Sequence, residues 1–281
     1  NQPQDYLTDV LARKATDFIT RTAALPSPPP FFAEISVYAP HFPSTPAPRH
    51  ATLFPDAQAP RTPSFDEADM SDKPPFMQAL PPLSASDIQN IDQEYRLRLR
   101  SLQAVDEMIA AVVQTLQATG QLENTYIFFT SDNGYHMGQH RYLPGKGTPY
   151  EEDIRVPLVA RGPGVPQGIV RRELGSLIDL TSTVAEIAGA SLSLAADGRS
   201  LLPLLHSAAP APSWRSAVFV ESYPVASQLQ SVITGVMEPP DQLDRQLARL
   251  DLILPNYSLL RTESYKYVER AGIEQELYNL V

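Results

Sequence analysis

A helical spacing of hydrophobic positions dominates two stretches of the chain. The first predicts a helix over residues 5–22, with apolar side chains recurring every three or four positions. The second predicts a longer helix that Ser86 or Asp87 caps and Gly120 ends. Its apolar stripe is formed by Ile91, Tyr95, Leu99, Leu102, Val105, Ile109, Val112 and Leu116.

Strand-like patterns flank the longer helix. Phe31–Tyr38 reads as a strand, and Thr125–Thr130 is apolar on both faces, as expected of a buried parallel strand. Strand, helix and strand in this order predict a βαβ unit with a right-handed crossover. Between them, about residues 40–86 are crowded with proline and short of any period. A loop of this length inside a compact domain is either functional or disordered.

The second half of the chain continues the α/β pattern and then changes. Val156–Ala160 predicts a strand and Leu177–Ala188 a helix. After a proline-rich link near residues 210–212, the patterns predict a smaller, more antiparallel part. Its expected elements are strands at Ala217–Glu221, Tyr257–Thr262 and Tyr265–Glu269 and a helix near Asp241–Leu250. We therefore expect an α/β domain over residues 1–206 and a smaller subdomain over residues 207–281.

Composition excludes several classes of function. With 281 residues and 43% hydrophobic residues, the chain can bury a sizeable core. A net charge of −10 argues against a nucleic-acid partner, because a phosphate backbone calls for a basic face. The absence of cysteine excludes disulfides and thiolate metal sites, and no apolar run is long enough for a membrane span. The first residues carry no secretory pattern, and Asn256 begins one glycosylation sequon, to which we give little weight.

The densest chemistry follows the strand that ends at Thr130. Asp132 and Asn133 offer a carboxylate and an amide oxygen, both suited to a hard cation such as Ca²⁺, and Gly134 permits the irregular backbone that lets both reach one ion. Lys146, one of only four lysines, lies between two glycines that let the backbone approach a ligand. In open α/β sheets, ligands bind beyond the carboxyl ends of strands. The stretch thus predicts a metal-assisted site for a tetrahedral oxyanion, although Asp-Asn-Gly alone also forms tight turns.

Several histidines are candidates beside this loop. His41 lies between prolines after a predicted strand and could protonate a departing alkoxide, or serve only as a hydrogen-bonded loop residue. His136 and His140 flank the metal loop and could line a substrate pocket, with His136 touching the anion, or simply pack against its wall. Arg49 and His50 are weaker substrate-side candidates. We assign no catalytic role to the acidic residues 151–153, and Asp179 fits a helix N-cap better than a site.

These motifs resemble a known family. The string SDNGYHMGQHR, followed by PGK, YEEDIRVPL and RGPGV, is similar to the arylsulfatase and N-acetylglucosamine-6-sulfatase branch of the sulfatases, in the alkaline-phosphatase-like superfamily. Blocks near Tyr38–Pro43, Leu177–Leu180 and Leu260–Tyr278 stand in the family's order. The resemblance implies a mostly parallel sheet flanked by helices, with a smaller antiparallel C-terminal subdomain and with the N-terminal part of the fold missing.

The resemblance also implies roles. Asp132 and Asn133 correspond to ligands of Ca²⁺, which we expect rather than Mg²⁺. Lys146 and His41 correspond to residues that face the sulfate, as catalytic and substrate-binding groups. Family members attack sulfur with a formylglycine made from a Cys/Ser-x-Pro-x-Arg motif. The nearest string here, from Ser44 to Arg49, has one residue too many and lies in the wrong place.

The resulting expectation is a Ca²⁺-assisted sulfuric ester hydrolase of the arylsulfatase type, acting on an aryl sulfate or sulfated sugar. We expect its formylglycine and its other metal ligands upstream, in an N-terminal portion of the same enzyme, so that this chain alone is incomplete and inactive. Alternatives are a sulfatase for N-acetylglucosamine-6-sulfate or another sulfated glycan, a phosphodiesterase or phosphomutase, and a non-catalytic module. Family habit places such enzymes in secreted, lysosomal or periplasmic locations.

Overall fold

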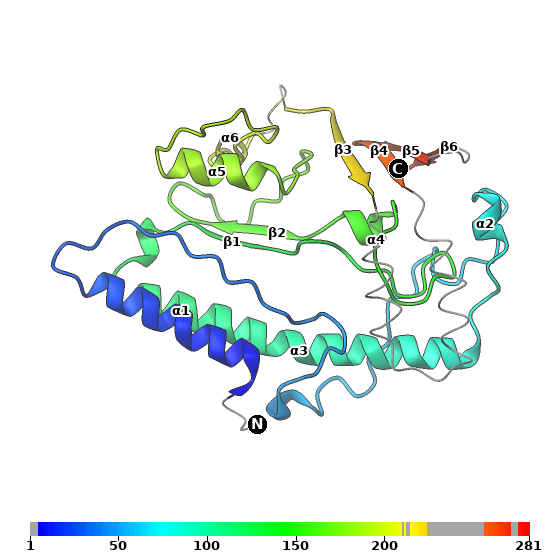
Figure 1. Ribbon diagram of the computed structural model, residues 1–281, viewed down its shortest axis with the longest axis horizontal. Helices are drawn as coiled ribbons and strands as arrows, with labels where there is room; N and C mark the ends of the chain where they lie inside the picture. The colour runs from blue at the N-terminus through cyan, green and yellow to red at the C-terminus, as the bar shows by residue number, and fades with distance from the viewer. Residues whose placement is uncertain (1–4, 210, 212–213, 224–255, 271–274) are drawn as a thin grey trace. The chain divides into compact units, whose positions relative to one another are not determined.

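The computed structural model of the protein describes residues 5–209, 211, 214–223, 256–270 and 275–281 (Figure 1). The chain divides into two compact units that interleave in sequence. The first comprises Asn1–Phe65 and Leu83–Ile127, and the second comprises Asp66–Pro82 and Phe128–Val281. The predicted boundary between residues 206 and 207 stays a prediction.

Two helices form the framework of the first unit. Helix α1 (Leu7–Ala23) packs against α3 (Ala85–Ala118), and the two lie side by side in Figure 1. Both helical predictions are confirmed. Ile91, Val105 and Leu116 of the predicted stripe of α3 are buried, as expected when residues three and four apart share one helix face.

Helix α3 begins two residues earlier than the sequence predicts. Ser84, not Ser86 or Asp87, is its N-cap. The Asp87 amide donates to Ser84 Oγ at 3.1 Å, and the Ser84 amide donates to the Asp87 carboxylate at 2.9 Å. Asp87 is therefore the third helical residue of a capping box, in which two amides at the helix start find partners.

Removing this cap is expected to destabilise the protein modestly. Replacing Ser84 by alanine leaves the Asp87 amide without its partner, so the free energy of unfolding should fall by about 1 kcal/mol. Urea unfolding monitored by circular dichroism measures the change. Ser27→Ala, at an exposed serine outside the helices, is the control. An unchanged unfolding midpoint in Ser84→Ala would contradict the assignment of the cap.

The prediction of a strand at Phe31–Tyr38 is wrong. These residues form no strand, and the Phe31 ring instead packs edge-on against Phe18 of α1, with centroids 5.6 Å apart. A β-strand is defined by its hydrogen bonds to a neighbour, and no described strand pairs with this segment. The first strand of the expected βαβ unit is therefore absent from the described part of the chain.

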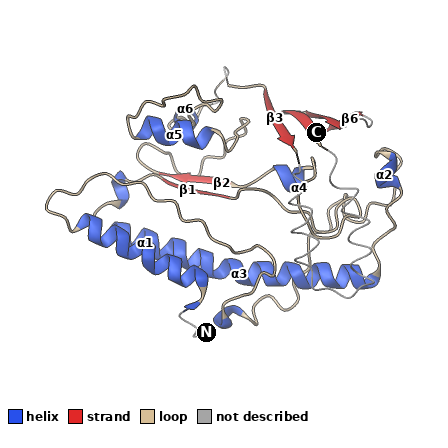
Figure 2. Cartoon of the chain, viewed as in Figure 1, coloured by secondary structure: helices blue, strands red, loops and turns tan. Residues whose placement is uncertain are grey.

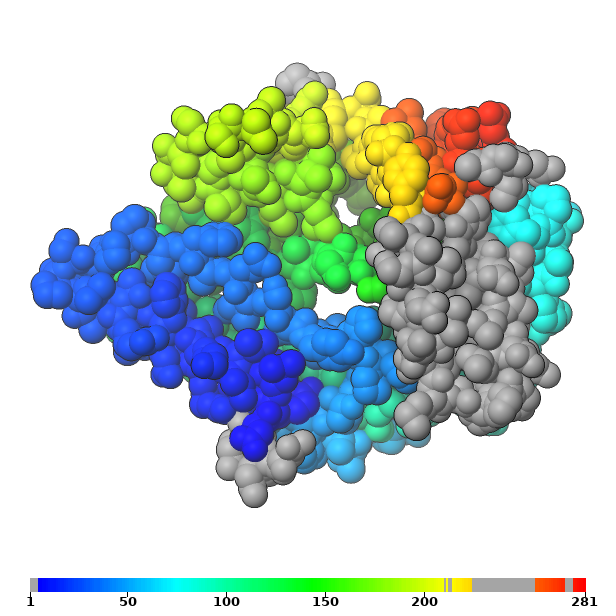
Figure 3. Space-filling view, in the orientation of Figure 1, coloured from blue at the N-terminus to red at the C-terminus, as the bar shows by residue number. Residues whose placement is uncertain are grey.

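The proline-rich stretch is shared between the two units. In the first unit it contains helix η2 (Pro48–His50) and is anchored to α3 by Arg61 and the Ala59 amide, which both donate to Asp92. Figure 3 shows residues 31–60 of this unit at the visible surface, in lighter blue. In the second unit it contains helix α2 (Pro75–Gln78).

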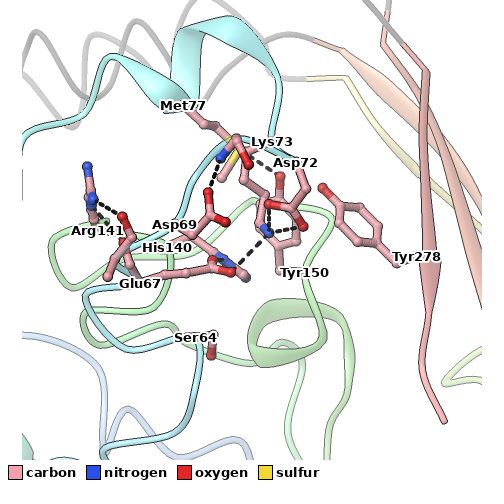
Figure 4. Close-up of polar contacts among 12 residues, drawn as sticks. Ser64, Glu67, Asp69, Asp72, Lys73, Met77, His140, Arg141, Tyr150 and Tyr278 are labelled. Carbon is pink, nitrogen blue, oxygen red and sulfur yellow. Dashed lines mark hydrogen bonds and ion pairs between the residues drawn. The ribbon is translucent and has the colours of Figure 1, made fainter.

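Arg141 fastens the second-unit part of that stretch. Its guanidinium donates to the carbonyl oxygen of Glu67 at 2.9 Å (Figure 4). It also donates to the carbonyl oxygens of Ala68 and Leu80, each at 2.9 Å. The buried side chains of Met70, Met77 and Leu80 pack with Tyr142 and Tyr150 into one core cluster. Residues 66–82 are thus built into the second unit, although they lie between two segments of the first.

Strand β1 (Ile127–Thr130) pairs with β2 (Leu158–Arg161), close to the two predicted strands. Leu158 and Val159 point to opposite faces of β2, yet they are 40% and 61% exposed. Among the described residues this sheet has two strands only. The other elements of this part are η3 (Leu122–Asn124), α4 (Glu151–Ile154), α5 (Asp179–Ile187), which confirms the predicted helix, and α6 (Leu202–Leu205).

The C-terminal sheet confirms the predicted antiparallel part. Strands β3 (Ala217–Ser222), β4 (Tyr257–Thr262), β5 (Tyr265–Arg270) and β6 (Gln275–Asn279) pair in sequence order, each antiparallel to the next (Figure 2). Leu259 and Val268 oppose each other in its buried core. The sequence misses β6, because there a glutamate is buried and Leu277 is exposed. The helix predicted near residues 241–250 lies outside the described residues.

Within the described part of the chain, none of the helices has the length and apolar character needed to cross a bilayer.

Candidate active site

The loop after β1 brings Asn133 and Lys146 together. The Lys146 ammonium donates to Asn133 Oδ1 at 3.0 Å. Asp132 is exposed, and its Oδ1 accepts the Asn133 amide at 2.9 Å. Ser131 Oγ donates to the Asn133 carbonyl at 2.8 Å and steadies the turn. A carboxylate, an amide oxygen and a positive charge therefore share one accessible loop.

Gly134 is required here for a reason that the sequence does not reveal. The Gly134 and Tyr135 amides donate to the carbonyls of Asp153 and Glu152 at 2.8 and 2.7 Å. The two backbones lie so close that a Cβ on Gly134 would stand 1.9 Å from the Glu152 carbonyl oxygen. The glycine thus allows close backbone approach, which fixes the Asp132–Asn133 turn against the start of α4.

The glycines around Lys146 have separate functions. Gly145 exchanges both backbone hydrogen bonds with His136, at 2.9 and 3.1 Å. A Cβ on Gly145 would lie 3.0 Å from His136 Nε2, so the imidazole fills the space beneath it. Gly147 has φ of 101°, a conformation that side chains disfavour. Lys146 is thereby held out into solvent between two backbone positions that suit glycine.

The structure buries His136 instead of exposing it to a ligand. Its side chain is 2% exposed, and its Nδ1 lies 3.0 Å from both carboxylate oxygens of Asp153. Asp153 also accepts from the Thr148 amide at 2.8 Å and the Thr148 hydroxyl at 2.7 Å. The sequence analysis gives Asp153 no catalytic role and does not single out Thr148, since no spacing distinguishes Asp153 from the two glutamates before it.

His140 joins the packing of the second unit. Its Nδ1 hydrogen-bonds Glu67 at 2.8 Å, and its ring lies 4.5 Å from the Tyr150 ring (Figure 4). Burial lowers the pKa of His140 below its ordinary value of 6.5, and the hydrogen bond to Glu67 opposes this without reversing it. His140 is therefore held among Glu67 and Tyr150 inside the second unit, and its assignment to a substrate pocket stays a prediction.

This pKa shift predicts a dependence of stability on pH. The unfolded chain takes up a proton on His140 near pH 6.5, whereas the folded chain takes it up only at lower pH. The folded state should therefore lose stability as pH falls below about 6.5, because the unfolded state binds more protons there. His140→Gln keeps a donor for Glu67 and should lose less stability than wild type between about pH 7 and pH 5. Urea unfolding at a series of pH values measures this, and equal losses would contradict it.

A buried polar network ties the Lys146 loop to the C-terminal sheet. Glu276 accepts from the hydroxyls of Tyr150 and Tyr278, at 2.8 and 2.5 Å, and from Arg270 Nε at 2.7 Å. Burial raises the pKa of Tyr150 well above its usual value, so this phenol remains a donor. Tyr257 donates to the Thr148 carbonyl at 3.2 Å. The loop that carries Lys146 is thus tied to β6 through Tyr150 and to β4 through Thr148.

His41 belongs to the first unit, whereas the other candidates belong to the second. It is exposed, in a turn where its amide donates to the Tyr38 carbonyl at 2.8 Å. Its Nδ1 lies 2.9 Å from the Phe42 carbonyl, which can only accept, so Nδ1 carries the hydrogen and Nε2 is left for another partner. Its assignment to the leaving group stays a prediction.

Arg49, His50 and Asp179 have structural partners. Arg49 donates to Asp9 of α1 at 2.7 Å and to Glu107 of α3 at 2.5 Å, and His50 Nε2 lies 3.1 Å from Glu107. Asp179 is fully buried at the first position of α5. Its carboxylate accepts from the amides of Ser176 and Arg199 and pairs with Arg215. The prediction that Asp179 is the N-cap is wrong: Ile178 is the N-cap, and the Asp179 carboxylate binds two amides that lie outside α5.

The donor chemistry of the loop fits part of a Ca²⁺ site. Asp132 and Asn133 supply two hard oxygens, whereas Ca²⁺ takes about 6–8. Asn133 Oδ1 has a second lone pair beside the one that Lys146 uses. Among the described residues, no group of three or more His, Cys, Asp or Glu could hold a metal ion. The pair can therefore serve as two ligands of a site whose remaining oxygens come from elsewhere.

Comparisons with known proteins agree on one family. The family model described as Sulfatase matches residues 1–190. The chain is 42% identical over 222 residues to human N-acetylglucosamine-6-sulfatase, covering 79% of this chain and 40% of that protein. It is 42% identical over 213 residues to arylsulfatase of Volvox carteri, covering 67% of this chain and 32% of that one. The chain thus spans about 40% or less of the length of these two relatives.

Among solved structures, the phosphonate monoester hydrolase SpPMH from Silicibacter pomeroyi superposes with a TM-score of 0.74 at 24% identity. The match covers 100% of this chain and 55% of that one. At this identity the likeness concerns the fold alone. The matched region is therefore only part of the fold of SpPMH.

Proposed function

Because this chain belongs to the sulfatase family, we propose that it supplies the sulfate-binding and part of the metal-binding side of an active site that hydrolyses a sulfate monoester. Its fold is the alkaline-phosphatase-like fold of that family. One observation carries the proposal: the Lys146 ammonium lies 3.0 Å from Asn133 Oδ1, in the exposed loop that also presents Asp132. The Lys146 ammonium can bind an oxygen of a sulfate ester, while Asp132 and Asn133 can hold a metal ion beside it.

Each residue has a distinct task in this proposal. Lys146 binds a sulfuryl oxygen as a compact point charge. His41, whose Nε2 forms no hydrogen bond with a described residue, hydrogen-bonds or protonates the departing oxygen of the alcohol or phenol. We expected His136 to touch the sulfate. Because its ring is buried, we propose instead that it supports the Lys146 loop from the interior.

Asp132 and Asn133 would hold Ca²⁺ in preference to Mg²⁺, since Mg²⁺ usually keeps several waters. When bound, the ion would polarise the sulfuryl group and offset its charge. We place the formylglycine nucleophile outside this chain, since its sequence contains no Cys/Ser-x-Pro-x-Arg motif. We place the remaining metal ligands there too, since no group of three or more His, Cys, Asp or Glu among the described residues could hold a metal ion. The Ser44–Arg49 string does not substitute for the nucleophile motif, because Arg49 is already paired with Asp9 and Glu107.

We propose the N-terminal portion of the same enzyme as the partner that completes the site. The exposure of Leu158 and Val159 on opposite faces of β2 supports this, because a two-stranded sheet rarely stands alone in water. The length of the relatives supports it as well, since this chain spans 40% of the human one. We expect secretion or a lysosomal or periplasmic location.

The substrate class has two candidates within the family. An aryl sulfate is our first choice, and a 6-sulfated N-acetylglucosamine or another sulfated glycan is the alternative. The identities of 42% to an arylsulfatase and to an N-acetylglucosamine-6-sulfatase support the two equally. A non-catalytic module that only binds sulfate is the third candidate, which the lack of a nucleophile in this chain supports.

The test is an assay of the longest polypeptide that contains this chain, with an aryl sulfate, N-acetylglucosamine-6-sulfate and an aryl phosphonate as substrates. Hydrolysis of a sulfate ester is expected, and hydrolysis of the phosphonate alone would overturn the proposal. In parallel, melting temperature is measured with sulfate and Ca²⁺, because a ligand that binds the folded state raises it. Protection without turnover would point to the binding module.

A further inference from the structure

Asp153 joins the two segments that present the candidate ligands. Its side chain is 2% exposed, yet it accepts hydrogen bonds from His136 on one segment and from both the amide and hydroxyl of Thr148 on the other. A buried carboxylate is costly unless donors surround it. Here three donors converge on its two oxygens, so the buried charge is satisfied by these contacts alone.

These contacts determine which nitrogen of His136 carries the hydrogen. The Asp153 oxygens at 3.0 Å can only accept, so Nδ1 must donate. Nε2 is buried, and no described group forms a hydrogen bond with it. It lies beneath Gly145, where a Cβ would approach within 3.0 Å. In the neutral ring Nε2 is therefore an acceptor without a hydrogen.

The same residues hold Lys146 from both sides. Gly145, just before it, pairs its backbone with that of His136, and Thr148, two residues after it, is bound by Asp153. Lys146 itself then reaches Asn133 Oδ1. Fixing the backbone on both sides of a long, flexible side chain limits the positions that its ammonium can take, and so reduces the entropy lost on binding.

We propose that Asp153 is a positioning residue, which holds His136 in its Nδ1–H form and clamps Thr148, and thereby keeps the Lys146 ammonium beside Asn133. The sulfate part of this proposal rests on the proposed function, since it takes Lys146 as a ligand of the anion. The histidine part does not depend on that function and can be tested separately.

Asn at position 153 is the sharpest probe, because it has the same shape with one acceptor fewer. If its oxygen keeps the two bonds from Thr148, its NH₂ group faces His136 Nδ1. That nitrogen must then become the acceptor, and the hydrogen moves to Nε2, where no described acceptor awaits it. Asp153→Asn therefore predicts an exchange of the histidine tautomer together with a looser Lys146 loop.

The first measurement is ¹⁵N NMR of histidine-labelled protein, with His136 assigned through His136→Gln. At a pH where the ring is neutral, wild type should show hydrogen on Nδ1 and none on Nε2, and Asp153→Asn should show the reverse. Wild type with hydrogen on Nε2, or a variant that keeps the wild-type tautomer, would overturn the positioning role of Asp153.

The second measurement is sulfate affinity, from the dependence of melting temperature on sodium sulfate in the presence of Ca²⁺. Asp153→Asn should weaken sulfate binding about tenfold, the effect of burying the new Nε2–H donor of His136 without an acceptor among the described residues. Thr148→Val, which removes only the hydroxyl, should weaken it by a smaller factor, and Thr148→Ser should restore it. This milder pair keeps the test valid if Asp153→Asn folds poorly.

Asp179→Asn is the matched control, because it also removes a charge from a fully buried carboxylate with several donors. It should lower stability yet leave the sulfate affinity and the His136 tautomer unchanged. Equal loss of affinity in Asp179→Asn and Asp153→Asn would overturn the proposal. If Lys146→Ala binds sulfate as wild type does, the proposed function fails, whereas the tautomer experiment still decides the role of Asp153.

Discussion

Replacing Lys146 by alanine is expected to lower kcat/KM for sulfate-ester hydrolysis by about 10²–10³-fold, the usual effect of removing one preorganised group that stabilises developing charge. The expectation follows from the position of the ammonium, which lies 3.0 Å from Asn133 Oδ1 and projects from a loop whose backbone is hydrogen-bonded at Gly145 and Thr148. Steady-state kinetics of the longest polypeptide that contains this chain measures the effect.

Lys14→Ala is the matched control, because Lys14 is an exposed lysine on α1. It should leave kcat/KM unchanged. Lys146→Arg keeps the charge but replaces a point charge with a planar fork, so it should restore only part of the loss. A Lys146→Ala protein with wild-type kcat/KM would remove Lys146 from the site, whatever its effect on stability.

Gly134→Ala is expected to lower the free energy of unfolding by about 3 kcal/mol, at the upper end of what overpacking costs. The added Cβ would lie 1.9 Å from the Glu152 carbonyl oxygen and 2.9 Å from the Asp153 Cα. Both belong to backbone, so neither can turn aside as a side chain would. Relief requires the Asp132–Asn133 turn to separate from α4, which should also weaken the Ca²⁺ binding that we propose for this turn.

Gly175→Ala is the control for this change. The nearest atom to its new Cβ would be Leu201 Cδ2 at 4.0 Å, an ordinary van der Waals contact. Urea unfolding of both variants separates a general effect of losing glycine from the specific collision. Equal stabilities of the two variants would contradict the close approach at Gly134.

Much of the fold follows from local patterns. The stripe along α3 and the alternation in β4 and β5 identify those elements, because one face of each is buried within its own unit. The failure at Phe31–Tyr38 has a different origin. Its composition favours a strand, but a strand needs a neighbour to pair with, and pairing is a property of the whole sheet. The early start of α3 at Ser84 reflects the reciprocal bonds of a capping box.

In the candidate site, too, some residues can be recognised from the sequence and others cannot. Asp132, Asn133 and Lys146 are recognisable because short motifs present them on one loop, and the contact between Asn133 and Lys146 agrees with that interpretation. The residues behind them were missed. Asp153 gains its importance from burial and from donors at irregular spacings, 5 and 17 residues before it. Glu276 gains its importance from burial and from a distant donor, Tyr150, which is 126 residues away. No pattern of neighbours along the chain records such contacts.

The grip of Arg141 on residues 67–80 has a consequence for the order of events during synthesis. The carbonyls that it binds leave the ribosome 61 to 74 residues before the arginine does. At about 5–20 residues per second, this segment waits roughly 3–15 s for its partner. Meanwhile α1 and α3 can already associate, since every residue of both has emerged first. Until Arg141 has been synthesised, residues 66–82 therefore remain a loop between α1 and α3. They can join the second unit only after that.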